Sequence, residues 1–337
     1  RVVSNMTRRI GVLTSGGDPP GMNAAVRTVV RAALSFGMEP YGIYRGYHGM
    51  INDEIEPLSS ASVSGIIQRG GTILKSARSS EFMTESGINK AIANLEKHQI
   101  EAVVVIGGDG SFRGALELMR RGIQVVCIPA TIDNDIACTD FSIGFDTAVN
   151  TVMDAVNKIR DTASSHERIY VVEVMGRHSG YIALYAGLAG GADSILIPEV
   201  KVDLNEVCAK IQRAYKAGKN HNIVIVAEGV SQQLRTNDDV RNVSFTIGKY
   251  LEEQTGYETR IVILGHIQRG GAPTVNDRLL ASRLAYHAVS LINQGKTGKM
   301  VGQIDKNIQA WDLEYALAQE KAIDMEYYYL ANLISAM

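Results

Sequence analysis

Short hydrophobic runs alternate with helix-like segments along most of the chain. The runs are apolar almost throughout rather than at every second position, which is typical of strands covered on both faces, as in a parallel sheet. Between them lie helix-like segments such as 21–37 and 87–99. We therefore predict an α/β layered fold. The strand-like runs are 10–14, 102–107, 125–129, 169–174, 194–198, 222–228 and 260–265.

Polar or glycine-rich clusters follow nearly every one of these runs. They read SGGDPPG, GGDGS, ATIDND, MGRHSG, AEG and GHIQRGG. In open parallel sheets, ligands bind at the carboxyl ends of the strands, so we expect the chemistry at these junctions. The tetrapeptide QRGG occurs twice, at 68–71 and 268–271. Two copies define no repeat period, and we interpret the second copy as coincidence.

The composition is that of a globular protein and argues against some partners. Of 337 residues, 45% are hydrophobic and 21% charged, with a net charge of −2. Such a chain has no general attraction for nucleic acid or an anionic membrane, and no apolar run is long enough to cross a bilayer. Cys127, Cys138 and Cys208 show no metal-binding spacing. We therefore expect free thiols and a cytoplasmic protein.

Two glycine-rich loops follow strand-like runs. The first places Gly16, Gly17 and Gly21 where backbone N–H groups can approach a phosphate, although a tight turn explains these residues equally well. In the second loop, Asp109 stands at the start of a helix-like segment. A carboxylate there would repel a phosphate unless a cation intervenes, and Mg²⁺ is commonly held by one or two carboxylates plus nucleotide phosphates. The alternative is that Asp109 is a helix N-cap; the two loops together favour a magnesium–nucleotide site.

Two carboxylates bracket an amide directly after the run 125–129. Asp133 and Asp135 flank Asn134, and in phosphoryl transfer one such carboxylate can accept the proton of an attacking hydroxyl. Taken alone, the three residues are more simply interpreted as a surface turn held by Asx hydrogen bonds.

Arginines at the ends of strand-like runs favour the catalytic interpretation of these carboxylates over the surface turn. The default role of each is a solvated surface charge, but the second half of the chain concentrates four of them, and guanidinium groups suit bidentate phosphate binding. We predict a second phosphorylated ligand, with His266 at the same junction as one arginine and Glu228 accepting hydrogen bonds from hydroxyls. The arginines are Arg168, Arg177, Arg260 and Arg269.

The order of these motifs resembles a known family, the bacterial ATP-dependent 6-phosphofructokinases. The matching segments are IGVLTSGGDPPGMNAAVR, GGT, VVVIGGDGS, TIDNDI, TDFSIGFDTA, RDTASSHERIYVVEVMGRHSGY, GHIQRGG and DRLLASRL. The resemblance runs from about residue 9 to about residue 302 and fades in the tail.

The resemblance implies a fold, a reaction and an assembly. The fold would have two similar three-layer lobes, each with a mainly parallel sheet flanked by helices. Residues 1–144 plus about 268–318 would form a nucleotide-binding lobe, and residues 145–267 plus about 319–337 a sugar-phosphate-binding lobe. The reaction would transfer the γ-phosphoryl group of ATP, with Mg²⁺, to the 1-hydroxyl of fructose 6-phosphate in glycolysis. The assembly would be a homotetramer whose subunits complete one another's active sites.

Site roles are implied for the residues that match the family motifs. The nucleotide would be held by Gly17, Arg78, Ser79, Gly108, Asp109, Gly110 and Ser111, with Asp109 on Mg²⁺. Asp133 would be the base, supported by Thr131, Asp135, Arg78 and Arg177. Sugar-phosphate contacts are implied for Thr131, Ile132, Asp133, Met175, Gly176, Arg177, Glu228, His266, Ile267, Gln268 and Arg269, joined by Arg168 and Arg260 from an adjacent subunit.

Two further expectations concern the donor and the effectors. Pyrophosphate-using relatives carry an acidic residue at the position of Gly110 and a lysine at that of Ala130, so ATP is favoured as the donor, although glycine is more usual than alanine at position 130.

A site for ADP or phosphoenolpyruvate is implied for Arg27, Arg31, Arg160, Gly191, Asp193, Lys219 and His221. Ser60 and Ala217 replace an arginine and a lysine there, and Asp193 replaces a glutamate. We therefore expect weakened control, since each charge-assisted hydrogen bond is worth roughly 1.5–3 kcal/mol.

Other classes explain less of the sequence. Lipid and NAD kinases share a GGDG loop but not TIDND together with GHIQRGG. A pyrophosphate-dependent phosphofructokinase is the alternative enzyme. A catalytically silent regulatory homologue is the alternative of another class, and the retained Asp109, Asp133 and Arg177 argue against it.

Overall fold

The chain folds into two compact units, each built on its own sheet. The computed structural model describes residues 8–234 and 243–335. Unit 1 takes the chain up to Thr131, then Ile136–Thr147 and Arg269–Lys321. Unit 2 takes Ile132–Asp135, Ala148–Gln268 and the chain from Ala322 onward. The predicted lobes put residues 132–135 in the first lobe and residues 145–147 in the second, whereas here residues 132–135 cluster with unit 2 and residues 145–147 with unit 1.

The sheet of unit 1 has a parallel centre and antiparallel edges. Its strand order is β11-β10-β5-β4-β1-β2-β3, in which β11 and β3 are antiparallel to their neighbours. The strands are β1 (Arg9–Thr14), β2 (Glu39–Ile43), β3 (Ile55–Pro57), β4 (Ile100–Gly107), β5 (Gln124–Pro129), β10 (Lys299–Ile304) and β11 (Asn307–Asp312).

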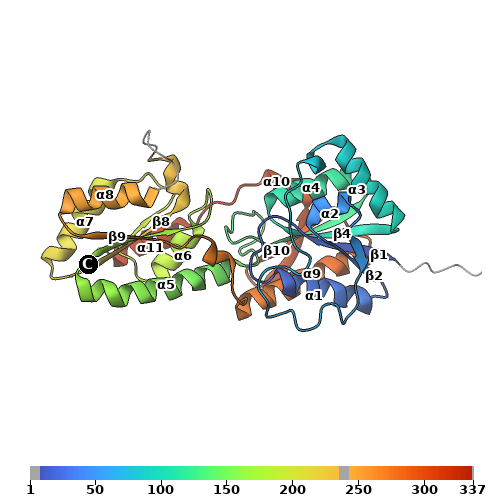
Figure 1. The fold of residues 1–337 in the computed structure, drawn as a ribbon, viewed down its shortest axis with the longest axis horizontal. Coiled ribbons are helices and arrows are strands. Elements are labelled where there is room, and N and C mark those ends of the chain that lie inside the picture. The colour runs from blue at the N-terminus through green and yellow to red at the C-terminus, as the bar shows by residue number, and fades with distance from the viewer. Residues whose placement is uncertain (1–7, 235–242, 336–337) are drawn as a thin grey trace, which may run out of the picture. The chain divides into compact units, whose positions relative to one another are not determined.

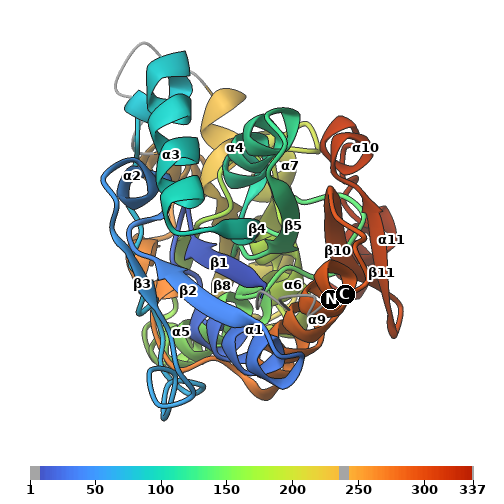
Figure 2. The ribbon, with the colours of Figure 1, turned by 90° about the vertical axis from the view of Figure 1, so that its right-hand side faces the viewer.

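Helices cover both faces of this sheet, as Figure 2 shows. On one face α1 packs with α9, and on the other lie α2, α3, α4 and α10. This double cover explains why β4 is buried at seven of its eight positions and reads as an unbroken apolar run. The helices are α1 (Met22–Ser35), α2 (Gly46–Ile51), α3 (Glu85–Lys97), α4 (Asp109–Arg120), α9 (Val275–Asn293) and α10 (Leu313–Ala318), with the 3₁₀ turn η1 (Glu81–Met83) before α3.

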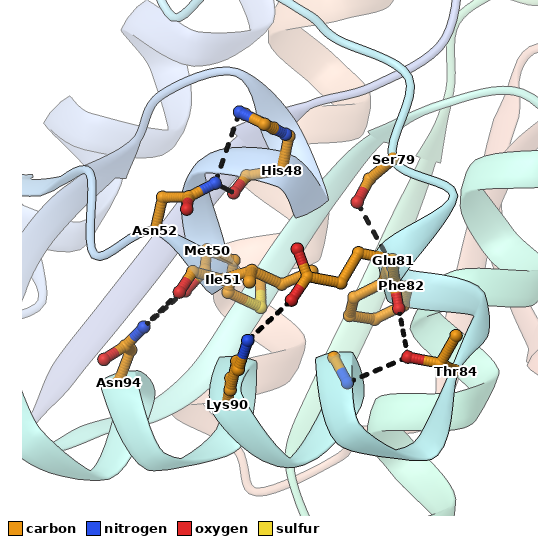
Figure 3. Close-up of polar contacts among 11 residues, drawn as sticks. His48, Met50, Ile51, Asn52, Ser79, Glu81, Phe82, Thr84, Lys90 and Asn94 are labelled. Carbon is orange, nitrogen blue, oxygen red and sulfur yellow. Dashed lines mark hydrogen bonds and ion pairs between the residues drawn. The ribbon is translucent and has the colours of Figure 1, made fainter.

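Asparagine side chains secure unit 1 at two places by bonding to the backbone. On α3, Asn94 donates from Nδ2 to the carbonyl oxygens of Met50 and Ile51, at 2.9 Å each (Figure 3). These bonds satisfy carbonyls at the end of α2, where no further helical turn follows to donate N–H groups to them. The second asparagine, Asn23, lies at the start of α1 and is described below.

Unit 2 contains a four-stranded, wholly parallel sheet. Its order is β7-β8-β6-β9, with α7 and α8 on one side and α5 and α6 on the other (Figure 1). The strands are β6 (Ile169–Val174), β7 (Ser194–Leu196), β8 (Asn222–Ala227) and β9 (Thr259–Ile263). The helices are α5 (Phe145–His166), α6 (Tyr181–Ala189), α7 (Leu204–Lys216), α8 (Val243–Thr255) and α11 (Met325–Ile334), with 3₁₀ turns η2 (Glu228–Gln232) and η3 (Gly265–Arg269). The start of α5, up to Thr147, and Arg269 at the end of η3 cluster with unit 1.

The predicted α/β fold with mainly parallel sheets is confirmed, and all seven predicted runs contain strands. Four strands were missed, namely β2, β3, β10 and β11. β2 contains Pro40 and Gly42, which weaken a strand signal. β11 is an antiparallel edge strand with no buried position, so it lacks the apolar run on which the prediction depends.

Candidate functional site

The first glycine loop joins β1 to α1 without a side-chain cap. Gly16 and Gly21 have φ values of 85° and 110°, which side chains rarely adopt. The Ser76 hydroxyl donates to the Gly16 carbonyl at 2.8 Å. A Cβ on Gly17 would lie 2.2 Å from Nη1 of Arg269. The structure of unit 1 therefore brings a predicted phosphate-binding arginine directly over a predicted nucleotide-binding glycine.

The second loop leaves the start of α4 open. Gly108 is the N-cap and offers no side chain, so the first N–H groups of the helix keep their capacity to bind an anion. A Cβ on Gly107 would meet the Ser15 carbonyl at 2.6 Å and Ser111 Oγ at 2.5 Å; only glycine fits here. A Cβ on Gly108 would lie 3.8 Å from Thr131 Cβ, which places Thr131 beside this loop.

Asp109 is a candidate magnesium ligand rather than a helix cap. It occupies the first helical position, so the N-cap alternative is wrong. Its carboxylate is half exposed and receives hydrogen bonds from Arg113 Nε at 2.8 Å and Nη2 at 3.3 Å. Arg113 follows at the i+4 position, a spacing that could have identified this ion pair. In residues 8–234 and 243–335, no three His, Cys, Asp or Glu side chains gather to hold a metal. A single carboxylate completed by donor phosphates still fits Mg²⁺.

The segment that carries Arg78 and Ser79 is held against α4 by two aromatic rings. Phe82 stacks on Tyr47 with ring centroids 4.2 Å apart, and the Tyr47 hydroxyl donates to the Ser111 carbonyl. Ser79 Oγ accepts the Phe82 N–H at 3.2 Å (Figure 3). Ser79 is therefore fixed relative to the glycine loop, while Arg78 is exposed.

In unit 2 the turn after β5 contains a buried carboxylate. Asp133 is 3% exposed and Asn134 is fully buried, so the surface-turn interpretation is wrong for these two; Asp135 is exposed. Oδ2 of Asp133 lies 3.5 Å from Nε of Arg177, and its carbonyl accepts the Ser179 hydroxyl at 3.0 Å. Two predicted catalytic residues are thus neighbours, and no motif in the sequence pointed to Ser179.

Glu228 shapes the turn that carries Arg177. Its Oε1 accepts the N–H groups of Gly176 at 3.1 Å and Arg177 at 2.7 Å. Both residues have left-handed φ values, 138° and 54°, a conformation that costs a non-glycine residue energy. Gln268 holds Met175, the residue before Gly176. Gln268 is fully buried, and its Oε1 accepts the Met175 N–H at 3.2 Å. His266 and Ile267 are exposed.

Arg168 and Arg260 lie at the other end of the same sheet. They stand at the amino ends of β6 and β9, whereas Met175 and Glu228 follow the carboxyl ends of β6 and β8. A six-residue strand separates the two edges by about 20 Å. Both guanidinium groups contact the Glu258 carboxylate, Arg168 at 2.6 Å, and Arg168 keeps the pKa of Glu258 below its usual value. Glu258 was also missed, although it directly precedes the run that contains Arg260.

The predicted effector residues divide between the two units. Arg27 and Arg31 lie on α1 in unit 1. In unit 2, Lys219 pairs with the buried Asp193, and Arg160 donates to the carbonyls of Gly190 and Gly191. Burial lowers the pKa of His221. Gly191, Asp193 and Lys219 line a cavity of about 170 Å³ together with Ala331, Ile334 and Ser335 of the tail.

Two remaining features bear on chemistry and membranes. Cys127 and Cys208 are buried free thiols and Cys138 is partly buried; burial raises the pKa of all three, which disfavours the reactive thiolate. In the part of the chain that the structure describes, none of the helices combines the length and apolar character needed to span a bilayer.

Comparison with known proteins assigns the family. Residues 9–292 match the family model described as Phosphofructokinase. The chain belongs to the phosphofructokinase family. The ATP-dependent 6-phosphofructokinase of Halothermothrix orenii is 54% identical over 97% of this chain and 99% of its own length. That of Bacillus subtilis is 55% identical with the same coverage.

Solved phosphofructokinase structures share the fold. The Saccharomyces cerevisiae phosphofructokinase superposes with a TM-score of 0.84 at 33% identity; the match covers 98% of this chain and 48% of that chain. A pyrophosphate-dependent phosphofructokinase from Marinobacter aquaeolei also gives a TM-score of 0.84, at 22% identity, over 95% of this chain and 86% of that chain. Family membership accounts for the order of the motifs from the first glycine loop to the GHIQRGG segment.

Proposed function

We propose that this protein transfers the γ-phosphoryl group of ATP to the 1-hydroxyl of fructose 6-phosphate, giving ADP and fructose 1,6-bisphosphate. The observation that carries the proposal is the buried Asp133 carboxylate with the Arg177 guanidinium at 3.5 Å. The acceptor is assigned to this turn of unit 2, and the donor to the glycine loops of unit 1. The curated relatives at 54–55% identity are named for the same activity.

The chemical step requires a base and a stabilised transition state. Asp133 takes the proton of the 1-hydroxyl as its oxygen attacks the γ-phosphorus; the bond from phosphorus to the β-phosphate oxygen breaks, and ADP leaves. Arg177 balances the charge of the moving phosphoryl group. Thr131, Asp135 and Arg78 support the reacting groups. Asp109 would hold Mg²⁺, which would offset the negative charge of the donor's phosphates.

Binding of the two substrates is assigned to separate sets of residues. The nucleotide phosphates bind to Gly17, Ser79 and the open start of α4, from Gly108 to Ser111. The sugar binds to Ile132, Met175, Gly176 and Glu228, and its 6-phosphate to His266, Ile267, Gln268 and Arg269. Glu228 has one oxygen engaged by the backbone, so its other oxygen is the one assigned to a sugar hydroxyl.

A homotetramer is part of the proposal because, within one chain, Arg168 and Arg260 lie at the opposite end of the sheet from Arg177. Arg168 and Arg260 lie about a strand length, or about 20 Å, from the turn of Arg177, too far to reach the same phosphate. A neighbouring subunit that presents its own copies would complete the phosphate site. ADP or phosphoenolpyruvate remains the proposed effector class, with weak control because Lys219 and Arg160 are already engaged within the chain. A cytoplasmic location stays a prediction.

ATP is proposed as the donor rather than pyrophosphate because the residues at positions 110 and 130 are small and uncharged. Gly110 carries no side chain toward the donor, and the neighbouring Ala130 is a buried small residue whose N–H donates to the Gly107 carbonyl at 2.9 Å. The test is an assay of the purified protein with fructose 6-phosphate and either MgATP or magnesium pyrophosphate. Turnover with ATP supports the proposal; turnover with pyrophosphate alone would reassign the donor, and none with either would favour a silent homologue.

A further inference from the structure

The two QRGG segments, whose similarity the sequence alone leaves as coincidence, touch each other through Gly70 and Gly271, both in unit 1. A Cβ on Gly70 would lie 2.4 Å from the carbonyl oxygen of Gly271 and 3.4 Å from its nitrogen. No side chain fits between two backbones at that distance, so glycine at position 70 is what allows the contact. Gly271 follows Arg269 by two residues, and the Arg269 guanidinium lies over Gly17.

The segment 69–76, which carries Gly70, has no helix or strand of its own and depends on side chains for its position. Asn23, at the start of α1 and 1% exposed, provides three of the bonds. Its Nδ2 donates to the carbonyls of Arg69 and Gly70 at 3.2 Å each, and its Oδ1 accepts the Ile73 N–H at 2.8 Å. A buried amide that satisfies three backbone groups in this way is costly to replace.

Thr14 and Ser76 tie the same segment to the first glycine loop. Thr14 Oγ1 lies 2.8 Å from Thr72 Oγ1 and donates to the Lys75 carbonyl at 2.8 Å. Ser76 Oγ donates to the Gly16 carbonyl at 2.8 Å. The 69–76 segment therefore contacts the glycine loop on one side and the backbone just after Arg269 on the other.

We propose that Asn23 is a positioning residue for Arg269. By fixing the 69–76 segment, Asn23 fixes Gly70 against Gly271 and so sets where the Arg269 guanidinium can reach. Asn23 touches no reacting group; it acts through the backbone contact. The inference rests on the proposed role of Arg269 in binding the 6-phosphate of the sugar.

The test is a double-mutant cycle between Asn23→Ala and Arg269→Ala, read in steady-state kinetics. Asn23→Ala alone should raise KM for fructose 6-phosphate about tenfold with kcat nearly unchanged, because a displaced binding group weakens substrate binding. In the Arg269→Ala background, Asn23→Ala should raise KM no further, since residues that act through one group are not additive. If Asn23→Ala raised KM for fructose 6-phosphate by the same factor in the parent and in Arg269→Ala, the inference would be overturned.

A matched control comes from the same unit. Asn94→Ala also removes two bonds from an asparagine amide to backbone carbonyls but lies on α3, away from the 69–76 segment. It should lower the free energy of unfolding without changing KM for fructose 6-phosphate. If Asn94→Ala raises KM as much as Asn23→Ala, the effect is one of general stability and the inference fails.

A second variant approaches the same contact from the other side. Gly70→Ala, which leaves Asn23 intact, should reproduce the rise in KM, and it keeps the inference testable if Asn23→Ala does not fold. An unchanged KM for fructose 6-phosphate in Gly70→Ala would show that the contact between Gly70 and Gly271 does not position Arg269. Failure of the underlying proposal is distinguishable, because in that case Arg269→Ala itself would leave KM for fructose 6-phosphate unchanged.

Discussion

Nε of Arg177 lies 3.5 Å from Oδ2 of Asp133, and the two residues differ sharply in exposure. The arginine side chain is 61% exposed, whereas the aspartate side chain is 4% exposed. The guanidinium can therefore move toward a ligand while the carboxylate stays in place. Ser179, whose hydroxyl donates to the Asp133 carbonyl, holds the backbone of that turn. This is the arrangement that a fixed base with a mobile cationic partner requires.

Replacing the buried carboxylate should abolish most turnover. We expect Asp133→Ser to lower kcat by about 10²- to 10⁴-fold, the usual contribution of a general base, and to leave KM for fructose 6-phosphate nearly unchanged. Steady-state kinetics of the purified variant check this. Ordinary turnover would remove Asp133 from its proposed role.

Glu258 should compete with the sugar phosphate for two arginines. Its carboxylate pairs with both Arg168 and Arg260, so a phosphate has to displace it. We expect Glu258→Gln to lower KM for fructose 6-phosphate by about threefold, the modest effect expected of exposed ion pairs. The effect should shrink at high salt. A raised KM would mean instead that Glu258 orients the two guanidinium groups.

Gly107 should tolerate no side chain. A methyl group there would meet the Ser15 carbonyl and Ser111 Oγ, so Gly107→Ala should lower the free energy of unfolding by about 1–3 kcal/mol, the usual cost of overpacking. Denaturant titration measures it. For comparison, a Cβ on Gly110 meets nothing within 4 Å. Gly110→Ala should therefore leave the unfolding midpoint close to that of the parent, and equal destabilisation of both variants would refute the steric explanation.

Asp277 should make stability depend on pH between about 4 and 6. Its side chain is 1% exposed and accepts the N–H groups of Gly144 and Thr147 at 2.8 Å each, yet burial raises its pKa from 3.8 to about 6. Because the folded pKa is the higher one, the folded state favours the protonated form. The contribution of Asp277 to the free energy of unfolding is therefore greatest below its pKa in the unfolded state, near 3.8. It is lost as the pH rises through its pKa in the folded state, about 6. The total loss is on the order of 3 kcal/mol.

The variant Asp277→Asn isolates this contribution. It cannot ionise, so the difference in free energy of unfolding between the parent and the variant should move in the variant's favour as pH rises from 4 to 7. Chemical denaturation at several pH values gives that difference. The amide cannot accept bonds at both former oxygens, which adds a cost that is constant with pH. A difference that does not change with pH would show that Asp277 is ionised throughout.

The sequence predicted buried parallel strands well, because double cover by helices produces apolar runs such as that of β4. It missed β11, because an antiparallel edge strand with no buried position leaves no such run, and β10, which is buried at only three of its six positions. At the site, the residues proposed for catalysis were recognisable by their motifs. Glu258 and Asn23 were not recognisable, because their roles depend on groups that only the fold brings next to them. These groups are the two arginines beside Glu258 and the backbone of the 69–76 segment beside Asn23. The surface-turn interpretation of Asp133 failed for the same reason: burial of a polar turn is a tertiary property.

The late position of β10 in the chain governs how this protein can be made. β10 pairs with β5, and α9 packs on α1, so the sheet of unit 1 cannot be completed until the strands of unit 2, which lie between β5 and β10 in the sequence, have been synthesised. During synthesis, the face of α1 that later packs against α9 stays exposed to chaperones and to other nascent chains, although α1 precedes every other helix that the structure describes.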